Sequence, residues 1–267
     1  MLFCARDYST ICDGLSKLFS ADIEDIFLYL SSIHYEKRDN YIAKFIKDNL
    51  KKHITDIEFY HLSRSITPHK ALYPLGQLLL TENELSFFFR EHGIEFSKSG
   101  GVGISMFVDG SRVSNDIIDD HFILGKRFTS DMCICGFQIL ENIDNFKPGY
   151  LHDILKKSPE IIQSIDDVLE LNGALINDYN KRSEYYCYIG TVKFSEVGFN
   201  KGMQCEMFPN ADFEVKEQKY IYNLLTYAME KYLYSDVCSI TNAMIYCEKP
   251  IRIIDRIRPE DIWPEEI

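Results

Sequence analysis

The chain has 267 residues, of which 46% are hydrophobic and 26% are charged, and its formal net charge is −12. This composition excludes a disordered chain, and the acidity argues against a protein that follows nucleic acid along a broad basic surface. No apolar run approaches the roughly 20 residues that span a bilayer, and the start lacks the apolar stretch of a secretion signal, so we expect a cytoplasmic protein.

The eight cysteines fall in apolar or strand-like stretches and not at the spacing of a disulfide framework. Cys133 and Cys135 are two residues apart, which is too close for a usual zinc clip, and no second Cys/His pair with ligand spacing follows. We therefore expect neither disulfides nor a metal site.

The first fifty residues have the pattern of helices. One helix is expected to begin at the capping pattern Ser20–Glu24, and a second to cover about Asp39 to Lys52. The charge run Lys47–His53 is expected to be the solvated end of that helix and not a nucleic-acid patch. The first strand signal follows at Asp56–Ser63.

The middle of the chain alternates between the two kinds of element. The predictions are a helix that starts at Thr81–Glu84 and stops near Gly93, a strand over Gly103–Val108 that enters a turn at Asp109-Gly110, a strand over Met132–Leu140, and a helix over Pro159–Tyr179.

Strand signals then return in quick succession. We predict strands over Tyr185–Phe194, Gln204–Phe208 and Phe213–Val215, a helix over Lys216–Tyr234, and final strands over Ala243–Cys247 and Ile251–Ile257. Helices first, and then short strands broken by helical segments, predict an α+β fold with a split, mostly antiparallel β-sheet.

The chemistry is expected at Gln204 and Glu206. Residues two apart on a strand point to the same face, so these two side chains share one side while Cys205 and Met207 face the core. A carboxylate beside an amide suits gripping a ribose hydroxyl and stabilising an oxocarbenium-like centre. The alternative is an edge strand whose polar face is simply solvated.

The segment Gly202–Val215 resembles the final catalytic segment of ADP-ribosyltransferases, in which Gln or Glu, any residue and Glu precede apolar residues, Pro, a short turn, an aromatic and an aliphatic. Gln204, Glu206 and Pro209, followed by Phe213 and Val215, stand at the expected offsets. The version that begins with Gln looks like that of the clostridial exoenzymes that modify Rho GTPases. The resemblance implies that Glu206 stabilises the transition state and that Gln204 positions the acceptor.

A second segment, Phe59–Arg64, has the character of the strand that holds NAD in this superfamily. In the arginine-type families an Arg after such a strand grips the phosphates, whereas His61-x-Ser63-Arg64 resembles the histidine-type, poly-ADP-ribose-polymerase-like branch, in which the His bonds the adenosine ribose. A guanidinium suits pyrophosphate and an imidazole suits a hydroxyl. The alternatives are an interior histidine for His61 and a surface ion pair for Arg64.

The third element of the arginine-type families is a Ser-Thr-Ser strand that supports the catalytic Glu. Its nearest match here is Arg127-Phe128-Thr129-Ser130, which leads into the strand predicted over Met132–Leu140. Thr129 and Ser130 are therefore added to the predicted NAD site, and residues 150–180 become a helical insertion. The alternative is a helix cap or turn made of Thr and Ser.

Taken with the resemblance, the chain is expected to hold a helical N-terminal region over residues 1–54, packed on an ADP-ribosyltransferase-like catalytic domain over residues 55–267. NAD would be the substrate, and the resemblance implies a bacterial toxin or defence effector with a possible neutralising antitoxin. The acceptor stays open between protein side chain and nucleic-acid base.

A basic groove for a nucleic-acid acceptor could come from four cations: Lys126, Arg127, Lys181 and Arg182. Two other functions stay open beside the transferase. One is a NAD glycohydrolase, which would use the same carboxylate with water as acceptor, and the other is a non-catalytic α+β interaction protein.

Overall fold

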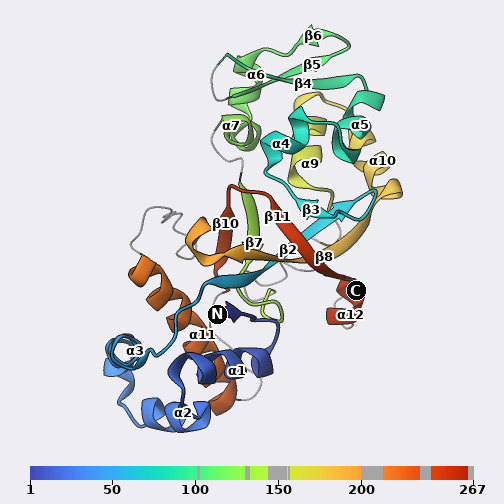
Figure 1. Ribbon diagram of the computed structural model, residues 1–267. Helices are drawn as coiled ribbons and strands as arrows, with labels where there is room; N and C mark the ends of the chain where they lie inside the picture. The colour runs from blue at the N-terminus through green and yellow to red at the C-terminus, as the bar shows by residue number, and fades with distance from the viewer. Residues whose placement is uncertain are drawn as a thin grey trace. The chain divides into compact units, whose positions relative to one another are not determined.

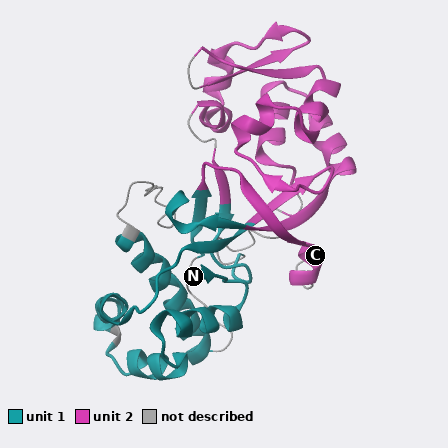
Figure 2. Cartoon of the chain, in the orientation of Figure 1, with its two compact units in different colours: residues 1–60, 136–150, 191–246 teal, residues 61–135, 151–190, 247–267 magenta. Residues whose placement is uncertain are grey.

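The computed structural model describes residues 1–100, 103–129, 133–143, 155, 157–199, 213–234 and 242–263 (Figure 1). The chain forms two compact units, each built from separated stretches of sequence (Figure 2). Unit 1 holds Met1–Tyr60, Gly136–Tyr150 and Thr191–Tyr246, and unit 2 holds His61–Cys135, Leu151–Gly190 and Cys247–Ile267. The predicted boundary between residues 54 and 55 falls inside the first segment of unit 1, and the two predicted domains stay a prediction.

Unit 1 is built around four helices that share one apolar core. They are α1 (Tyr8–Phe19), α2 (Ile23–Ser31), α3 (Tyr35–Asn49) and α11 (Phe213–Tyr234). Their contact faces repeat at helical spacing, and the buried positions include Leu15, Phe27, Ile42, Ile46 and Leu224. The predicted helical N-terminal stretch is confirmed.

The caps of these helices differ from the predicted pattern at Ser20. That residue ends α1 in the left-handed region, with φ 53°, and does not begin α2. The N-cap of α2 is Asp22, whose carboxylate accepts from the backbone N–H of Glu24 at 2.9 Å. Three residues, Ser20 to Asp22, separate the helices, so the chain needs a sharp left-handed exit from α1 before Asp22 can cap the next helix.

The strands of unit 1 flank this helical core. β1 (Leu2–Phe3) pairs in parallel with the start of β2 (Asp56–Ser65), and β2 pairs antiparallel with β7 (Ile134–Phe137) at Tyr60↔Phe137. The order continues through β10 (Met244–Cys247) to β9 (Val197–Phe199). Phe3 packs edge-on against Tyr220 of α11, with ring centroids 6.0 Å apart, which joins strand and helix in one core.

Gly136 lets β7 approach β2 closely. A Cβ at this position would overlap the Phe59 ring and lie 2.7 Å from the backbone oxygen of Tyr60. Backbone cannot yield as a flexible side chain can, so we expect Gly136→Ala to lower the free energy of unfolding by about 3 kcal/mol. Chemical denaturation of the variant beside Gly100→Ala, where an added Cβ meets nothing within 4 Å, measures this; equal stabilities of the two variants would contradict it.

Unit 2 combines short helices with two groups of antiparallel strands. β3 (Ala71–Leu72) pairs with β11 (Ile251–Ile257), and the order continues through β8 (Glu184–Lys193) to the second half of β2. A separate meander joins β4 (Ile94–Lys98), β5 (Ile104–Val108) and β6 (Ser111–Arg112). The helices are α4 (Leu75–Leu80), α5 (Glu84–Glu91), α6 (Asn115–Asp120), α7 (Phe122–Thr129), α9 (Glu160–Val168), α10 (Ala174–Arg182) and α12 (Pro259–Ile262).

The core of unit 2 lies between the β4–β6 meander and these helices. Its large side chains are Phe88, Phe89, Phe96, Phe128 and Tyr179, whose rings meet edge to face, as Phe88 and Tyr179 do at 4.9 Å. The predicted strand that enters the turn at Asp109-Gly110 is confirmed as β5, and aromatic packing holds the meander to which it belongs.

Three predicted elements are corrected. Phe213–Val215 is not a strand but the first turn of α11, and Val215 is 45% exposed. The helix predicted over Pro159–Tyr179 is broken at Leu169–Gly173, where Gly173 has φ 84° between α9 and α10. In the part of the strand predicted over Met132–Leu140 that the structure describes, residues 133–140, the regular strand covers Ile134–Phe137. Short apolar runs suit strand and helix equally, and in each place tertiary packing decided.

The predicted α+β class with mostly antiparallel strands is confirmed. No helix in the part of the chain that the structure describes is long and apolar enough to cross a membrane.

Candidate functional site

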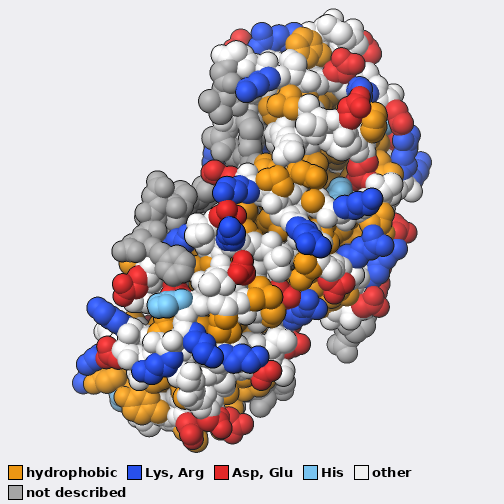
Figure 3. Space-filling view, in the orientation of Figure 1, with side chains coloured by type: hydrophobic (Ala, Val, Ile, Leu, Met, Phe, Trp, Pro, Cys, Tyr) orange, Lys and Arg blue, Asp and Glu red, His pale blue; other side chains and the backbone are white. Residues whose placement is uncertain are grey.

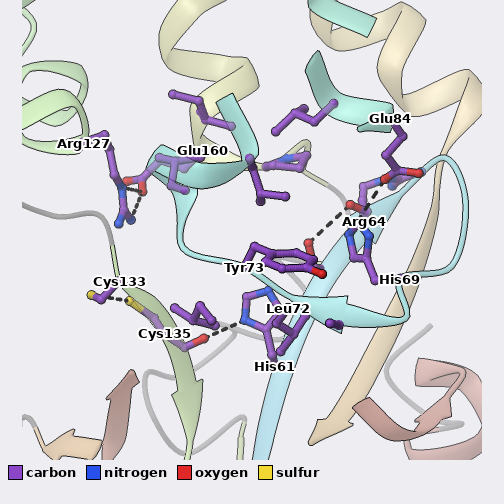
Figure 4. Close-up of a pocket in the computed structure, with 18 of the residues that line it drawn as sticks. His61, Arg64, His69, Leu72, Tyr73, Glu84, Arg127, Cys133, Cys135 and Glu160 are labelled. Carbon is purple, nitrogen blue, oxygen red and sulfur yellow. Dashed lines mark hydrogen bonds and ion pairs between the residues drawn. The ribbon is translucent and has the colours of Figure 1, made fainter. Parts of the chain in front are cut away.

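A cavity of about 210 Å³ lies within unit 2, and the second half of β2 forms part of its wall (Figure 4). His61, Ser63 and Arg64 contribute to the lining, together with residues of β3, α4, α5, α7 and α9. The apolar part of the wall comes mainly from leucine and isoleucine: Leu72, Leu75, Leu78, Leu85, Ile134 and Ile161. A few polar groups on an apolar wall are typical of a small-molecule site.

One ring nitrogen of His61 is hydrogen-bonded within the protein, and the other can take a ligand. Its Nδ1 lies 2.6 Å from the backbone oxygen of Cys135, and since a carbonyl only accepts, Nδ1 must donate (Figure 4). Burial lowers the pKa of His61 to about 4, and the charge of a protonated His69 contributes to this shift. The hydrogen bond to the Cys135 carbonyl acts in the opposite direction and raises the pKa. At neutral pH the imidazole is therefore uncharged, and its Nε2 is an acceptor that suits a hydroxyl donor.

Arg64 is held by the C-terminal end of α10. Its Nη2 donates to the backbone oxygens of Ser183 at 2.9 Å and Asn180 at 3.2 Å, and its Nε donates to the Ser183 hydroxyl at 3.2 Å. A guanidinium has five N–H donors, so these contacts leave the two on Nη1. Arg64 thus hydrogen-bonds carbonyls at the end of a helix, which is a structural role. With the described residues it does not form the surface ion pair that was the alternative from the sequence.

Ser63 lies between these two residues on β2 and lines the cavity half-buried. Its hydroxyl donates to the backbone oxygen of Arg64 at 3.3 Å, a long bond that a ligand could replace.

Glu84 and His69 are lining residues that the sequence did not indicate. The Glu84 side chain is 13% exposed and accepts from the backbone N–H groups of Ile66 and Thr67 and from the Thr67 hydroxyl. His69 Nε2 lies 3.8 Å from this carboxylate; burial lowers the pKa of His69, and the charge of Glu84 opposes the shift. In the sequence Glu84 is only a first-turn residue of a helix, because the loop that delivers its donors lies 18 residues earlier.

Arg127 and Glu160 form an ion pair at the edge of the cavity, from α7 and α9 (Figure 4). Arg182 is likewise paired, with Glu91 and with Asp178 at 2.9 Å. Lys126 lies over the Phe122 ring, 4.3 Å from its centroid. The basic groove was predicted from four cations: Lys126, Arg127, Lys181 and Arg182. Carboxylates pair with Arg127 and Arg182, so little net positive charge is left for a polyanion.

Cys133 and Cys135 also line the cavity, with their sulfur atoms 3.9 Å apart. Among the described residues, no group of three or more His, Cys, Asp or Glu side chains is placed to hold a metal ion.

The structure therefore brings together three of the predicted site residues: His61, Ser63 and Arg64. Thr129 is the last residue of α7; its hydroxyl donates to the Gly125 backbone oxygen at 2.7 Å, and it does not line the cavity. The helix-end alternative for Thr129 is the one observed. Ser130, Gln204 and Glu206 lie outside the described residues.

Comparisons with protein-family models, with curated proteins and with solved structures found no match to this chain.

Proposed function

We propose that the protein is a NAD-dependent ADP-ribosyltransferase and that the cavity of unit 2 takes one end of the dinucleotide. The observation that carries the proposal is that His61, Ser63 and Arg64, predicted from the sequence to hold NAD, line one cavity. The reaction breaks the bond between nicotinamide and ribose C1′, forms a bond from C1′ to an acceptor nucleophile and releases the proton of that nucleophile.

The state of His61 supports a hydroxyl ligand. Nδ1 is held by the Cys135 carbonyl and the ring is neutral, so Nε2 can accept a hydrogen bond. A neutral acceptor favours a hydroxyl over a charged phosphate. A ribose offers hydroxyl donors of this kind. Arg64 has two N–H donors left for a phosphate oxygen, which agrees with a ribose phosphate beside His61.

The size of the cavity supports partial enclosure of the dinucleotide. Its volume of about 210 Å³ lies below the roughly 300–1,000 Å³ of pockets that enclose a whole drug-sized ligand. Tyr73 is 39% exposed at the wall and could pack against a flat base. We assign a ribose and its neighbouring ring to the cavity, and the catalytic role to the sequence-predicted Glu206.

The proposal is tested with NAD carrying a radioactive phosphate, incubated with the protein and a cell lysate. We expect label to become acid-insoluble, and digestion with protease or nuclease then identifies the acceptor class. Label recovered as free ADP-ribose would instead support the glycohydrolase, and unchanged NAD in every lysate fraction would overturn the proposal.

His61→Ala should weaken NAD binding about tenfold, because a buried hydrogen bond contributes about 1.4 kcal/mol. The matched control is His34→Ala, since the His34 side chain in unit 1 is 66% exposed. A pKa of about 4 also means that His61 stays neutral above pH 5, so NAD affinity of the wild type should stay level from pH 8 to about pH 5. Calorimetric titration at several pH values measures both effects, and a fall in affinity centred near pH 6.5 would contradict the role given to a neutral His61.

A further inference from the structure

Positive charge is concentrated in one short stretch of this acidic chain. Residues 37–52 contain six lysines and arginines against two aspartates, a net charge of +4, whereas the whole chain carries −12. Neighbouring like charges repel one another on a folded surface, so a local excess of positive charge indicates a surface that binds an anionic partner.

The helix α3 arranges these cations on its solvent face. Ile42 and Ile46 are fully buried and fix which side of α3 faces the core of unit 1. At 100° per residue, Lys37, Tyr41, Lys44 and Lys47 lie on the opposite side, and the structure has all four exposed. From Lys37 to Lys47 this side of the helix is about 15 Å long.

Three more lysines join this face through a contact distant in sequence. The backbone N–H groups of Lys51 and Lys52 donate to the Leu18 oxygen at 2.9 and 3.2 Å, in the last turn of α1. That contact sets both residues beside Lys17, which is exposed on α1. We call Lys17, Lys37, Lys44, Lys47, Lys51, Lys52 and Tyr41 the basic face; Figure 3 shows blue side chains gathered over this part of unit 1.

Nearby carboxylates compensate only part of this charge. Among the described residues, no carboxylate forms an ion pair with any of the six lysines. Asp39 accepts instead from the Tyr222 hydroxyl at 2.9 Å, and buried Glu217 is bonded to His53 and to the Ile54 N–H. Asp48 lies on the same side of α3 as the lysines, and Glu36 and Asp13 are exposed near the face, so these three carboxylates reduce the charge of the six lysines from +6 to about +3.

Two exposed tyrosines accompany the lysines. Tyr41 is 46% exposed within the basic face, and Tyr29 of α2 is 54% exposed, with its ring 6.1 Å from that of Phe45, one turn along α3 from Tyr41. Cations that follow a phosphate backbone together with aromatic rings on which bases stack are the two parts of a single-strand binding surface. An anionic membrane would instead favour an outward apolar stripe, and the isoleucines of α3 face inward.

We propose that the basic face binds single-stranded nucleic acid, with phosphates on its lysines and a base on Tyr41. This reverses the expectation from the sequence that the run Lys47–His53 is only a solvated helix end, because the backbone contact at Leu18 brings Lys51 and Lys52 to Lys17. Its length of about 15 Å matches four to five stacked nucleotides at about 3.4 Å each. The surface lies in unit 1, outside the cavity, and binding there needs no NAD. The inference therefore goes beyond ADP-ribosyl transfer and does not depend on it.

The test is fluorescence anisotropy of the full chain with a labelled single-stranded oligonucleotide of about 12 nucleotides, without NAD. We expect the logarithm of the binding constant to fall against the logarithm of the salt concentration with a slope of about −3, as four neutralised phosphates require. The variant Lys37→Glu/Lys44→Glu/Lys47→Glu should bind about 100-fold more weakly. Tyr41→Ala should bind about tenfold more weakly with an unchanged slope, because stacking releases no counterions.

The control changes the same charge elsewhere: Lys70→Glu/Lys98→Glu/Lys249→Glu, three exposed lysines of unit 2. Circular dichroism of each variant confirms that it is folded. Equal weakening by the two triple variants, or full binding by the α3 variant, would overturn the inference. So would binding to phosphatidylserine vesicles without binding to the oligonucleotide.

Discussion

Replacement of Glu206 by alanine is expected to lower ADP-ribose transfer about 100- to 1,000-fold, the cost of removing one group that stabilises charge in a transition state. The ribose C1′ becomes positive as nicotinamide leaves, and the carboxylate of Glu206, predicted from the sequence to share a strand face with Gln204, would stabilise that charge. Initial rates of label transfer from radioactive NAD measure the loss. Binding of NAD should change far less than the rate, because the positive charge exists only in the transition state.

Two further variants separate charge from shape at this position. Glu206→Gln keeps the size and the hydrogen-bonding atoms but removes the charge, so it should lose almost as much rate as Glu206→Ala. Glu248→Ala is the matched control, since Glu248 is exposed in a turn of unit 2 and belongs to no predicted site. Undiminished transfer by Glu206→Gln would show that the charge of this residue does not drive the reaction.

The second large effect concerns the stability of unit 1. Glu58 on β2 has a side chain only 4% exposed, and it accepts from Arg6 at 2.8 and 2.9 Å and from the Tyr60 hydroxyl at 2.8 Å. Arg6→Ala would leave this buried carboxylate without its cation, so the free energy of unfolding at neutral pH should fall by about 3–5 kcal/mol. Urea denaturation measures the loss, with Arg112→Ala, an exposed arginine, as control.

The same pair predicts a pH dependence. Burial alone would raise the pKa of Glu58, but the hydrogen bonds from Arg6 and Tyr60 and the charge of Arg6 lower it below its usual value of 4.5. The stability that this carboxylate contributes is therefore complete above pH 4.5 and is lost as the pH falls through its lowered pKa. In Arg6→Ala the hydrogen bond and the charge of Arg6 no longer oppose burial, so the pKa of Glu58 rises and the carboxylate becomes neutral at a higher pH than in the wild type. The stability gap between wild type and variant should narrow from pH 7 towards pH 4, and a constant gap would contradict this account.

The sequence predicted only those residues of the candidate site that lie close together on one strand. His61, Ser63 and Arg64 lie within four residues of one another on β2, so strand character and residue type were enough to group them. Glu84 and His69 were not predictable, since they meet through the Thr67 loop and the first turn of α5. The role of Arg64 at the end of α10 depends on a contact across more than 110 residues, which no local pattern contains.

The sequence by itself determined the α+β class, the helical start, the strand β5 with its Asp109-Gly110 turn, and the two closing strands. Each of these follows from hydrophobic periodicity or turn chemistry, which act over a few residues. Tertiary structure alone decided the helical state of Phe213–Val215, because three residues carry no period. It also decided that Lys51 and Lys52 join Lys17 on one surface, since the Leu18 carbonyl that holds them lies 33 residues earlier in the chain.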